Sequence, residues 1–227
     1  MSVVAPPNTE LLPRRGWLVP RLRSFARDSA TVRRWRESRY RRFVQLCGLR
    51  SDDRILDVGA GLGGALERFN TVNEIVAVDI RPAKSEWLAK RNVTVHYGDG
   101  TKLPFRDDEF PVVFSSSVIE HVPRDLQPAF AAEIRRVSQR YFVQTPNRYF
   151  PIEPHYLLPF FHFLPERWRR ALNRRFTLGW QPRGHWEEIN LLSARELARL
   201  FPDAKIHRER VFGLSKSLMA VAGPPEN

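Results

Sequence analysis

Short apolar runs and helical periods alternate through the middle of the chain. The short apolar runs at 54–58, 74–80, 93–97, 111–115 and 140–145 are expected to be strands, and the first of them, RILDV, is typical of a buried strand. Apolar residues at helical spacing stand between the runs, at Leu62, Ala65, Leu66 and Phe69, at Trp87 and Leu88, and at Leu126, Phe130, Ile134 and Val137. This alternation predicts a doubly wound α/β fold, with a mostly parallel sheet covered by helices on both faces.

The C-terminal part continues with a helix and a hairpin. A helix is expected around 193–201, because Ser193 and Glu196 have the spacing of a capping box. Two further strands are expected at 205–212 and 216–221. Only the residues Gly213, Leu214 and Ser215 separate these strands, so they must pair as an antiparallel hairpin.

The N-terminal part has a different character. Residues 1–28 contain four prolines and no sustained period, which suggests an extended or partly ordered arm. From Thr31 a helix is expected, with apolar residues near one face and arginines on the other, and Gly48 would end it. We therefore divide the chain into an Arg-rich arm and cap helix (1–50) and a main domain (51–227) that carries an aromatic insert at 147–188.

The net charge indicates which classes of partner the chain could bind, and the cysteine content indicates its cellular compartment. The net charge is +12, and residues 1–50 hold twelve arginines against three acidic residues. Such a segment suits nucleic acid, an anionic membrane surface or a phosphorylated substrate, and it is equally compatible with a solvated basic face. Cys47 is the single cysteine, so no internal disulfide can form, and without a secretion signal or a membrane-spanning run the expected location is cytoplasmic.

The stretch DVGAGLGG at 57–64 is the main candidate for a ligand site. Glycines at 59, 61 and 64 fit the dinucleotide pattern G-x-G-x-x-G after a strand, so a nicotinamide-dependent oxidoreductase is one alternative. Asp57 ends the first strand, Asp79 ends the second 22 residues later, and Asp99 follows the third. Carboxylates at these strand ends would repel a pyrophosphate, whereas they suit a cationic ligand with free ribose hydroxyls.

Four segments resemble the class I S-adenosylmethionine-dependent methyltransferases. They are ILDVGAGLGG, VAVDI, GDGTKLPFRDDEFPVVFSSSVIEHV and VQTPN, and they follow the family's order and spacing between 53 and 147. The resemblance implies a Rossmann-like, seven-stranded sheet in which only the last strand is antiparallel. It also implies S-adenosyl-L-methionine as the cofactor.

The resemblance assigns roles to the residues at the strand ends. Gly59, Gly61 and Gly63 would line the methionine end of the cofactor, and Asp57 would hold the turn or the amino group. Asp79, with Ile80 beside it, would bind the ribose side. Asp99 and Gly100 would flank the adenine. Ser115 and Ser116 would close over the cofactor near the methyl group.

The methyl acceptor is less defined than the cofactor. The segment SSSVIEHV lacks the Asn/Asp-Pro-Pro-aromatic signature of enzymes that methylate nucleobase amines, and Cys47 lies too early to attack a pyrimidine ring. His121 is the first candidate for a general base, and His155 and His185 in the insert are its rivals. A weak divalent-metal site built from His and Glu residues is a minority alternative, because no tight ligand spacing is present, and our interpretation includes no metal.

The insert combines ten aromatic residues with seven arginines. An apolar lid with a basic rim suits an acceptor that has a ring-shaped or lipid part and an anionic part, although such aromatics also pack simply as structure. We therefore expect O-methylation of a small-molecule, saccharide or lipid-linked acceptor, with peripheral membrane contact through the Arg-rich N-terminus as a lesser expectation. The alternatives are an RNA-modifying methyltransferase and a non-catalytic cofactor-binding protein of the same fold.

Overall fold

One sheet organises the protein. The computed structural model describes residues 30–60, 73–80, 93–152, 158–175 and 188–223. The strands are β1 Ile55–Val58, β2 Ile75–Asp79, β3 Val93–Tyr97, β4 Phe110–Ser116, β5 Ser138–Pro146, β6 Lys205–Val211 and β7 Leu214–Ala222. They form a seven-stranded sheet in the order β3-β2-β1-β4-β5-β7-β6, in which β7 runs antiparallel to both of its neighbours. The predicted fold class is therefore confirmed.

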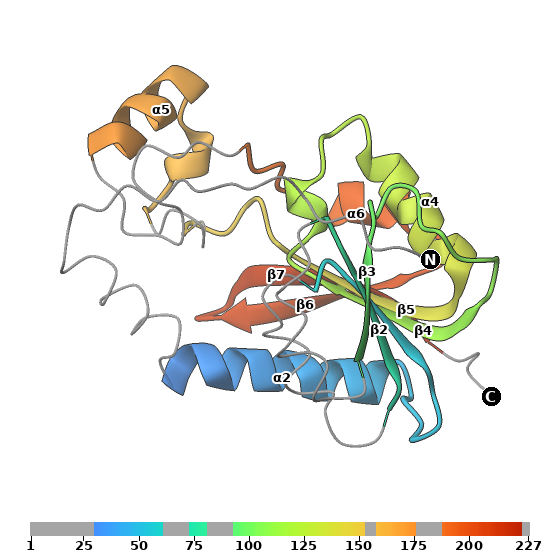
Figure 1. Cartoon of the computed structure of the whole chain (residues 1–227). Helices are drawn as coiled ribbons and strands as arrows, with labels where there is room; N and C mark the ends of the chain where they lie inside the picture. Colours follow the sequence, from blue (N-terminus) through green and yellow to red (C-terminus); the bar gives the residue numbers. More distant parts are fainter. Residues whose placement is uncertain (1–29, 61–72, 81–92, 153–157, 176–187, 224–227) are drawn as a thin grey trace.

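Helices cover the two faces of the sheet. The described helices are α2 Ala30–Leu46, α4 Gln127–Val137, α5 Glu166–Arg175 and α6 Ala194–Leu200, with 3-10 turns η1 Ile119–His121 and η2 Phe161–Phe163. Figure 1 shows α2 along one face, α4 and α6 on the other, and α5 standing off to one side. The predicted arm at 1–28, the helices expected at 62–69 and around Trp87, and parts of the insert at 153–157 and 176–187 lie outside the described residues.

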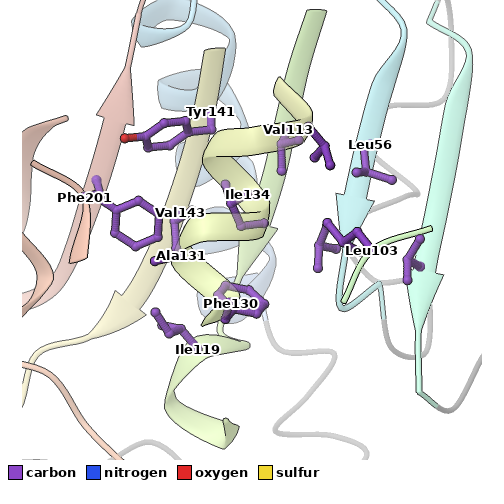
Figure 2. Packing of buried hydrophobic residues seen from close by; sticks show 14 of the residues in the cluster. Leu56, Leu103, Val113, Ile119, Phe130, Ala131, Ile134, Tyr141, Val143 and Phe201 are labelled. Carbon is purple, nitrogen blue, oxygen red and sulfur yellow. The ribbon is translucent and has the colours of Figure 1, made fainter. Parts of the chain in front are cut away.

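Alternation along the buried strands divides the core into two layers. Leu56, Val58 and Val113 belong to the layer beneath α4 and α6, where Phe130 and Ile134 of α4 pack (Figure 2). Ile55 and Phe114 belong to the layer beneath α2, together with Phe43, Cys47 and Phe142. The central strands β1 and β4 thus supply both layers from successive residues, as their continuous apolar runs require.

Arg140 fixes the direction of α2 across the sheet. This residue lies near the start of β5, and its guanidinium donates to the carbonyl oxygens of Cys47 and Gly48 at 2.8 and 2.9 Å. It also pairs with the buried Asp53 at 2.6 Å. Because these contacts hold the C-terminal end of α2 at the amino ends of the parallel strands, the N-terminal part of α2 reaches the opposite edge. We call that opposite edge, where β1 to β5 end, the carboxyl edge.

Gly48 ends α2 as predicted, with a φ of 56°. Cys47 is fully buried, and burial raises the pKa of its thiol to about 12. This supports the prediction of a packed thiol rather than a nucleophile.

Two details of the sequence prediction are wrong. The hairpin turn is formed by Phe212 and Gly213, which both have positive φ angles, of 49° and 79°, so Leu214 and Ser215 already belong to β7. The strand β4 extends one residue beyond the predicted run 111–115, so Ser116 also lies within it. The capping box of Ser193 and Glu196 is confirmed in both of its hydrogen bonds.

Candidate functional site

Two carboxylates lie together at the carboxyl edge. Asp57 is the third residue of β1 and Asp79 the last residue of β2. Alternation places both side chains on the face that α2 covers, because Ile55, Ile75 and Ala77 belong to that layer of the core. The structure therefore brings these two predicted site residues together.

Asp57 is a buried carboxyl group that pairs with no cation among the described residues. It is only 1% exposed, and no donor reaches its Oδ2 atom among the residues that the structure describes. Burial, together with the nearby charge of Asp79, raises the pKa of Asp57 to about 8. A buried carboxyl group is stable as an anion only beside a positive group, so this position favours a cationic ligand.

Gly59 permits a close approach of two segments. Its φ is +79°, and a Cβ atom there would lie 2.2 Å from Cγ2 of Val118. Its N–H donates to the carbonyl of Val78 at 2.7 Å. The first glycine of the loop therefore serves packing of the segment before η1 onto the end of β1, whereas Gly61 and Gly63 lie outside the described residues.

The turn after β3 supplies the next candidates. Oδ1 of Asp99 accepts hydrogen bonds from the N–H and the hydroxyl of Thr101, both at 2.8 Å, so this carboxylate shapes the turn. A Cβ atom on Gly100 would lie 2.7 Å from the ring of Phe130, which accounts for glycine there by packing alone. Ile80 follows Asp79 and is 57% exposed, which offers an apolar surface at the same edge.

The two predicted serines point to opposite faces of the sheet. Ser115 is 1% exposed and faces the layer that contains Val113. Ser116 faces α2, where its Oγ accepts a hydrogen bond from Nη1 of Arg39 at 2.7 Å and donates to Gln144 Oε1 at 2.8 Å. Arg39 is a residue that sequence reasoning missed, because nothing in the sequence separates it from the eleven other arginines of residues 1–50.

His121 and Glu120 follow β4 in η1. Glu120 is fully buried, its Oε2 accepts from the hydroxyl of Thr145 at 2.9 Å, and its Oε1 has no partner among the described residues. His121 is half-buried and lines an open hollow of about 420 Å³ together with Arg124, Asp125 and Glu188. Its rivals His155 and His185 lie outside the described residues.

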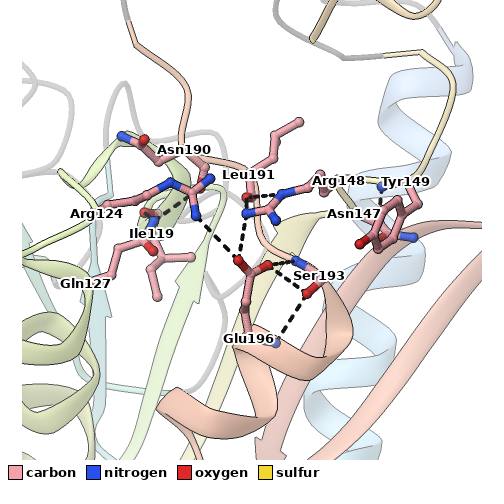
Figure 3. Close-up of polar contacts among 10 residues, drawn as sticks. All are labelled: Ile119, Arg124, Gln127, Asn147, Arg148, Tyr149, Asn190, Leu191, Ser193 and Glu196. Carbon is pink, nitrogen blue, oxygen red and sulfur yellow. Dashed lines mark hydrogen bonds and ion pairs between the residues drawn. The ribbon is translucent and has the colours of Figure 1, made fainter. Parts of the chain in front are cut away.

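Polar contacts tie the two ends of the insert to η1 and α6 (Figure 3). Nε2 of Gln127 donates to the carbonyl oxygens of Ile119 and Asn190 at 3.0 and 3.1 Å. Arg148 donates to Glu196 at 2.8 Å, and its guanidinium also reaches the carbonyl of Leu191. The insert therefore leaves and rejoins the domain beside the residues that follow β4.

Glu196 is the centre of these contacts. Burial acts to raise its pKa, but hydrogen bonds from Ser193 and the ion pair with Arg148 outweigh burial and lower the pKa to about 2. Arg124 approaches the same carboxylate at 3.4 Å. The carboxylate therefore remains charged at neutral pH and links the insert to α6.

In the described part of the chain, no three or more His, Cys, Asp or Glu side chains gather in a way that could hold a metal ion. Likewise, none of the helices in that part is long and apolar enough to cross a bilayer.

The sheet order and the edge carboxylates agree with the predicted Rossmann-like fold, and comparison with known proteins supports its class. Residues 56–140 match a family model described as "Methyltransferase domain". This match, which spans little more than a third of the chain, and the shared fold support the class I S-adenosylmethionine-dependent methyltransferases as the class of this chain.

Individual relatives agree with this class. The chain is 27% identical to 27-O-demethylrifamycin SV methyltransferase of Amycolatopsis mediterranei, in a match that covers 42% of this chain and 39% of that protein. The PH0226 protein of Pyrococcus horikoshii has the same fold, with a TM-score of 0.60 at 20% identity over 87% of this chain and 92% of the other. A third relative is the 1,6-didemethyltoxoflavin-N1-methyltransferase of Burkholderia thailandensis, whose structure contains bound S-adenosylhomocysteine; it has a TM-score of 0.58 at 16% identity, over 96% and 94% of the two chains.

The residues at the carboxyl edge fit this cofactor. S-adenosylmethionine carries a sulfonium and an ammonium group, and the buried Asp57 has an oxygen that lacks a donor. Asp79 at the end of β2 is suited to ribose hydroxyls, and the exposed Ile80 to the face of an adenine ring. The fit depends on charge and on position along the edge.

Proposed function

We propose that this chain transfers the methyl group of S-adenosylmethionine to a hydroxyl oxygen of a small or lipid-linked acceptor. The observation that carries the proposal is the buried Oδ2 of Asp57, which has no partner among the described residues and lies beside Asp79 at the carboxyl edge. A carboxyl group in this state favours a cationic ligand, whereas it would repel the pyrophosphate of a nicotinamide dinucleotide. The cofactor, when bound, supplies an electrophilic methyl group and leaves as S-adenosylhomocysteine.

In this proposal the chain contributes mainly by positioning. Asp57 would hold the cationic end of the cofactor and Asp79 its ribose, so that the methyl group faces the ends of β4 and β5. Alignment of two reactants in a protein site can lower a barrier by roughly 7 to 11 kcal/mol, so no protein nucleophile is needed.

His121 is the proposed acceptor of the proton. As the C–O bond forms and the C–S bond breaks, the hydroxyl proton passes from the acceptor to the imidazole. The position of His121 supports this role, because it directly follows the buried Glu120 and lines the open hollow beside the returning insert. A neutral imidazole is a suitable base near pH 7.

The acceptor is proposed to combine an apolar part with a polar hydroxyl. Several large apolar side chains in and beside the insert are exposed rather than packed, namely Tyr149, Phe160, Phe163, Leu164 and Trp168. Helix α5 adds five arginines beside them. The name of the rifamycin relative, which refers to an O-demethyl compound, is consistent with an oxygen acceptor.

Two variants test whether the carboxyl edge binds the cofactor. Asp79→Ala should weaken binding of S-adenosylhomocysteine in calorimetry by at least about tenfold, because ribose hydrogen bonds to a carboxylate are lost. Asp52→Ala removes an exposed carboxylate from the turn before β1 and serves as the matched control, with unchanged affinity. Binding without any difference between the two variants would contradict the assignment of the site.

The activity is tested with radiolabelled cofactor and fractionated lipids, glycans and RNA. Mass spectrometry of the labelled product should reveal a methyl ether from the lipid or glycan fractions, absent with the Asp79 variant. Ribonuclease-sensitive product would favour an RNA-modifying enzyme instead. Cofactor binding without any labelled product would favour the non-catalytic alternative.

A further inference from the structure

The middle of α2 places an arginine over the ends of β4 and β5. Nη1 of Arg39 donates to Ser116, which in turn donates to Gln144. One helical turn earlier, Trp35 lies under Nζ of Lys216, which is 3.2 Å from the centre of its ring. We call these five residues the Arg39 cluster.

The topology explains why Lys216 is present there. Because β7 is antiparallel, it begins at the carboxyl edge, and its Ser217 pairs with Pro146 at the end of β5. Trp35 and Arg39 are four residues apart and therefore share one face of α2. One helix and three strands thus converge on the cluster.

Both cations of the cluster lack an ionic partner. Neither Arg39 nor Lys216 takes part in any of the ion pairs among the described residues, and the guanidinium uses one of its five donors, toward Ser116. Burial lowers the pKa of Arg39 and also that of Lys216. Both residues are half-buried by accessible surface, and cations withdrawn from water in proteins are normally paired, so two that are not leave room for an anion.

The nearby carboxylates are committed elsewhere. Glu209 accepts a short hydrogen bond from the hydroxyl of Ser217, and Glu120 accepts one from Thr145. Both acids act on Arg39 through their charges, and Glu209 also acts on Lys216, without an ion pair being formed. Two cations therefore remain available at one place on the carboxyl edge.

We propose that the Arg39 cluster binds an anionic group of the methyl acceptor, a carboxylate or a phosphate, an inference that rests on the proposed function. The guanidinium matches the planar or tetrahedral oxygens of such a group through paired N–H donors, and Lys216 adds a point charge. Carboxylates at the ends of β1 and β2 serve the cationic cofactor, whereas cations at β4, β5 and β7 serve the anionic acceptor. The two charges of opposite sign would orient the acceptor relative to the methyl group.

The test uses inorganic phosphate and acetate as probes, with S-adenosylhomocysteine bound. Thermal unfolding is followed at pH 7 while each probe replaces chloride at constant ionic strength, and the rise in Tm gives its apparent Kd. The Kd of at least one probe should increase by about tenfold or more in Arg39→Gln and in Lys216→Gln, because a charge-assisted contact is lost. Arg41→Gln is the charge-matched control on the same helix, since Arg41 is exposed and pairs with Glu37, and it should leave Kd unchanged.

The outcomes separate this inference from the proposed function. A response to acetate alone identifies a carboxylate acceptor, and a response to phosphate alone identifies a phosphorylated one. No response to either probe, or equal losses in the Arg39 and Arg41 variants, overturns the inference even though S-adenosylhomocysteine binds. Failure of S-adenosylhomocysteine to bind the wild-type protein would instead overturn the proposed function. If Arg39→Gln does not fold, Lys216→Gln decides, because the Lys216 ammonium makes no hydrogen bond within the described residues.

Discussion

Replacement of Asp57 by Asn should stabilise the cofactor-free protein increasingly as the pH rises. The ordinary pKa of this carboxyl group is 3.8, and burial together with Asp79 raises it to about 8. In the folded protein the group is therefore neutral between these values, while in the unfolded chain it is ionised. A raised pKa in the folded state means that stability is complete below the unfolded pKa and is lost as the pH rises toward 8.

The magnitude follows from the size of the pKa shift. Each pH unit within this window costs the wild-type protein about 1.4 kcal/mol, which amounts to about 4 kcal/mol at pH 7 relative to pH 4. The Asn variant has no ionisable group at this position and does not lose this stability. Its amide would leave a buried N–H group without an acceptor, at a cost of about 1 to 3 kcal/mol that does not depend on pH.

The assay is urea unfolding of both proteins at pH 5, 6 and 7 without cofactor. The difference in unfolding free energy should shift in favour of Asp57→Asn by about 2.7 kcal/mol between pH 5 and 7. Bound S-adenosylhomocysteine should reduce this shift, because its ammonium favours the ionised carboxylate of the wild type. A difference between the two proteins that is constant across this pH range would refute the reasoning.

Three further predictions concern the site and its supports. Glu196→Gln should cost about 1 to 2 kcal/mol at pH 7, a value discounted for partial exposure. The pKa of about 2 means that the stability of the wild-type pair is present above the ordinary pKa of 4.5 and is lost as the pH falls through 2, so unfolding at pH 7 and pH 3 should show the difference shrink by about half. Gly59→Ala should lower the free energy of unfolding by about 2 kcal/mol or more in denaturant unfolding, because the φ of Gly59 is +79° and the added methyl carbon would lie 2.2 Å from Val118. A smaller residue in place of Val118 should recover part of this loss. His121→Ala should lower kcat by about 100-fold or more with unchanged affinity for S-adenosylhomocysteine, whereas wild-type turnover would remove this residue as the base.

The sheet could be predicted because its strands are marked in the sequence. The run at 93–97 gives β3 with both ends correct, and the other strands differ from prediction by at most two residues at either end. The hairpin turn was placed too late because Phe212 reads as a strand residue, although it is fully exposed and has a positive φ. An aromatic residue in that conformation is uncommon, and nothing in its neighbours indicates it.

The candidate site was predictable only in part, for a different reason. Asp57 and Asp79 follow from strand ends, which the sequence marks. The opposite orientations of Ser115 and Ser116 follow from the two-residue period of a strand, once both are placed inside β4. Arg39 depends on how far α2 extends along the sheet and on which strand it faces, and those are properties of the packed structure.

The antiparallel direction of β7 places the two groups of proposed site residues in different parts of the chain. The carboxylates proposed to bind the cofactor stand at the ends of β1 and β2, early in the chain. The hairpin before β7 comes late and opens onto the same edge, where it brings Lys216. If both proposals hold, a change in the length or charge of this hairpin would alter the choice of acceptor without touching the segments proposed to hold the methyl donor.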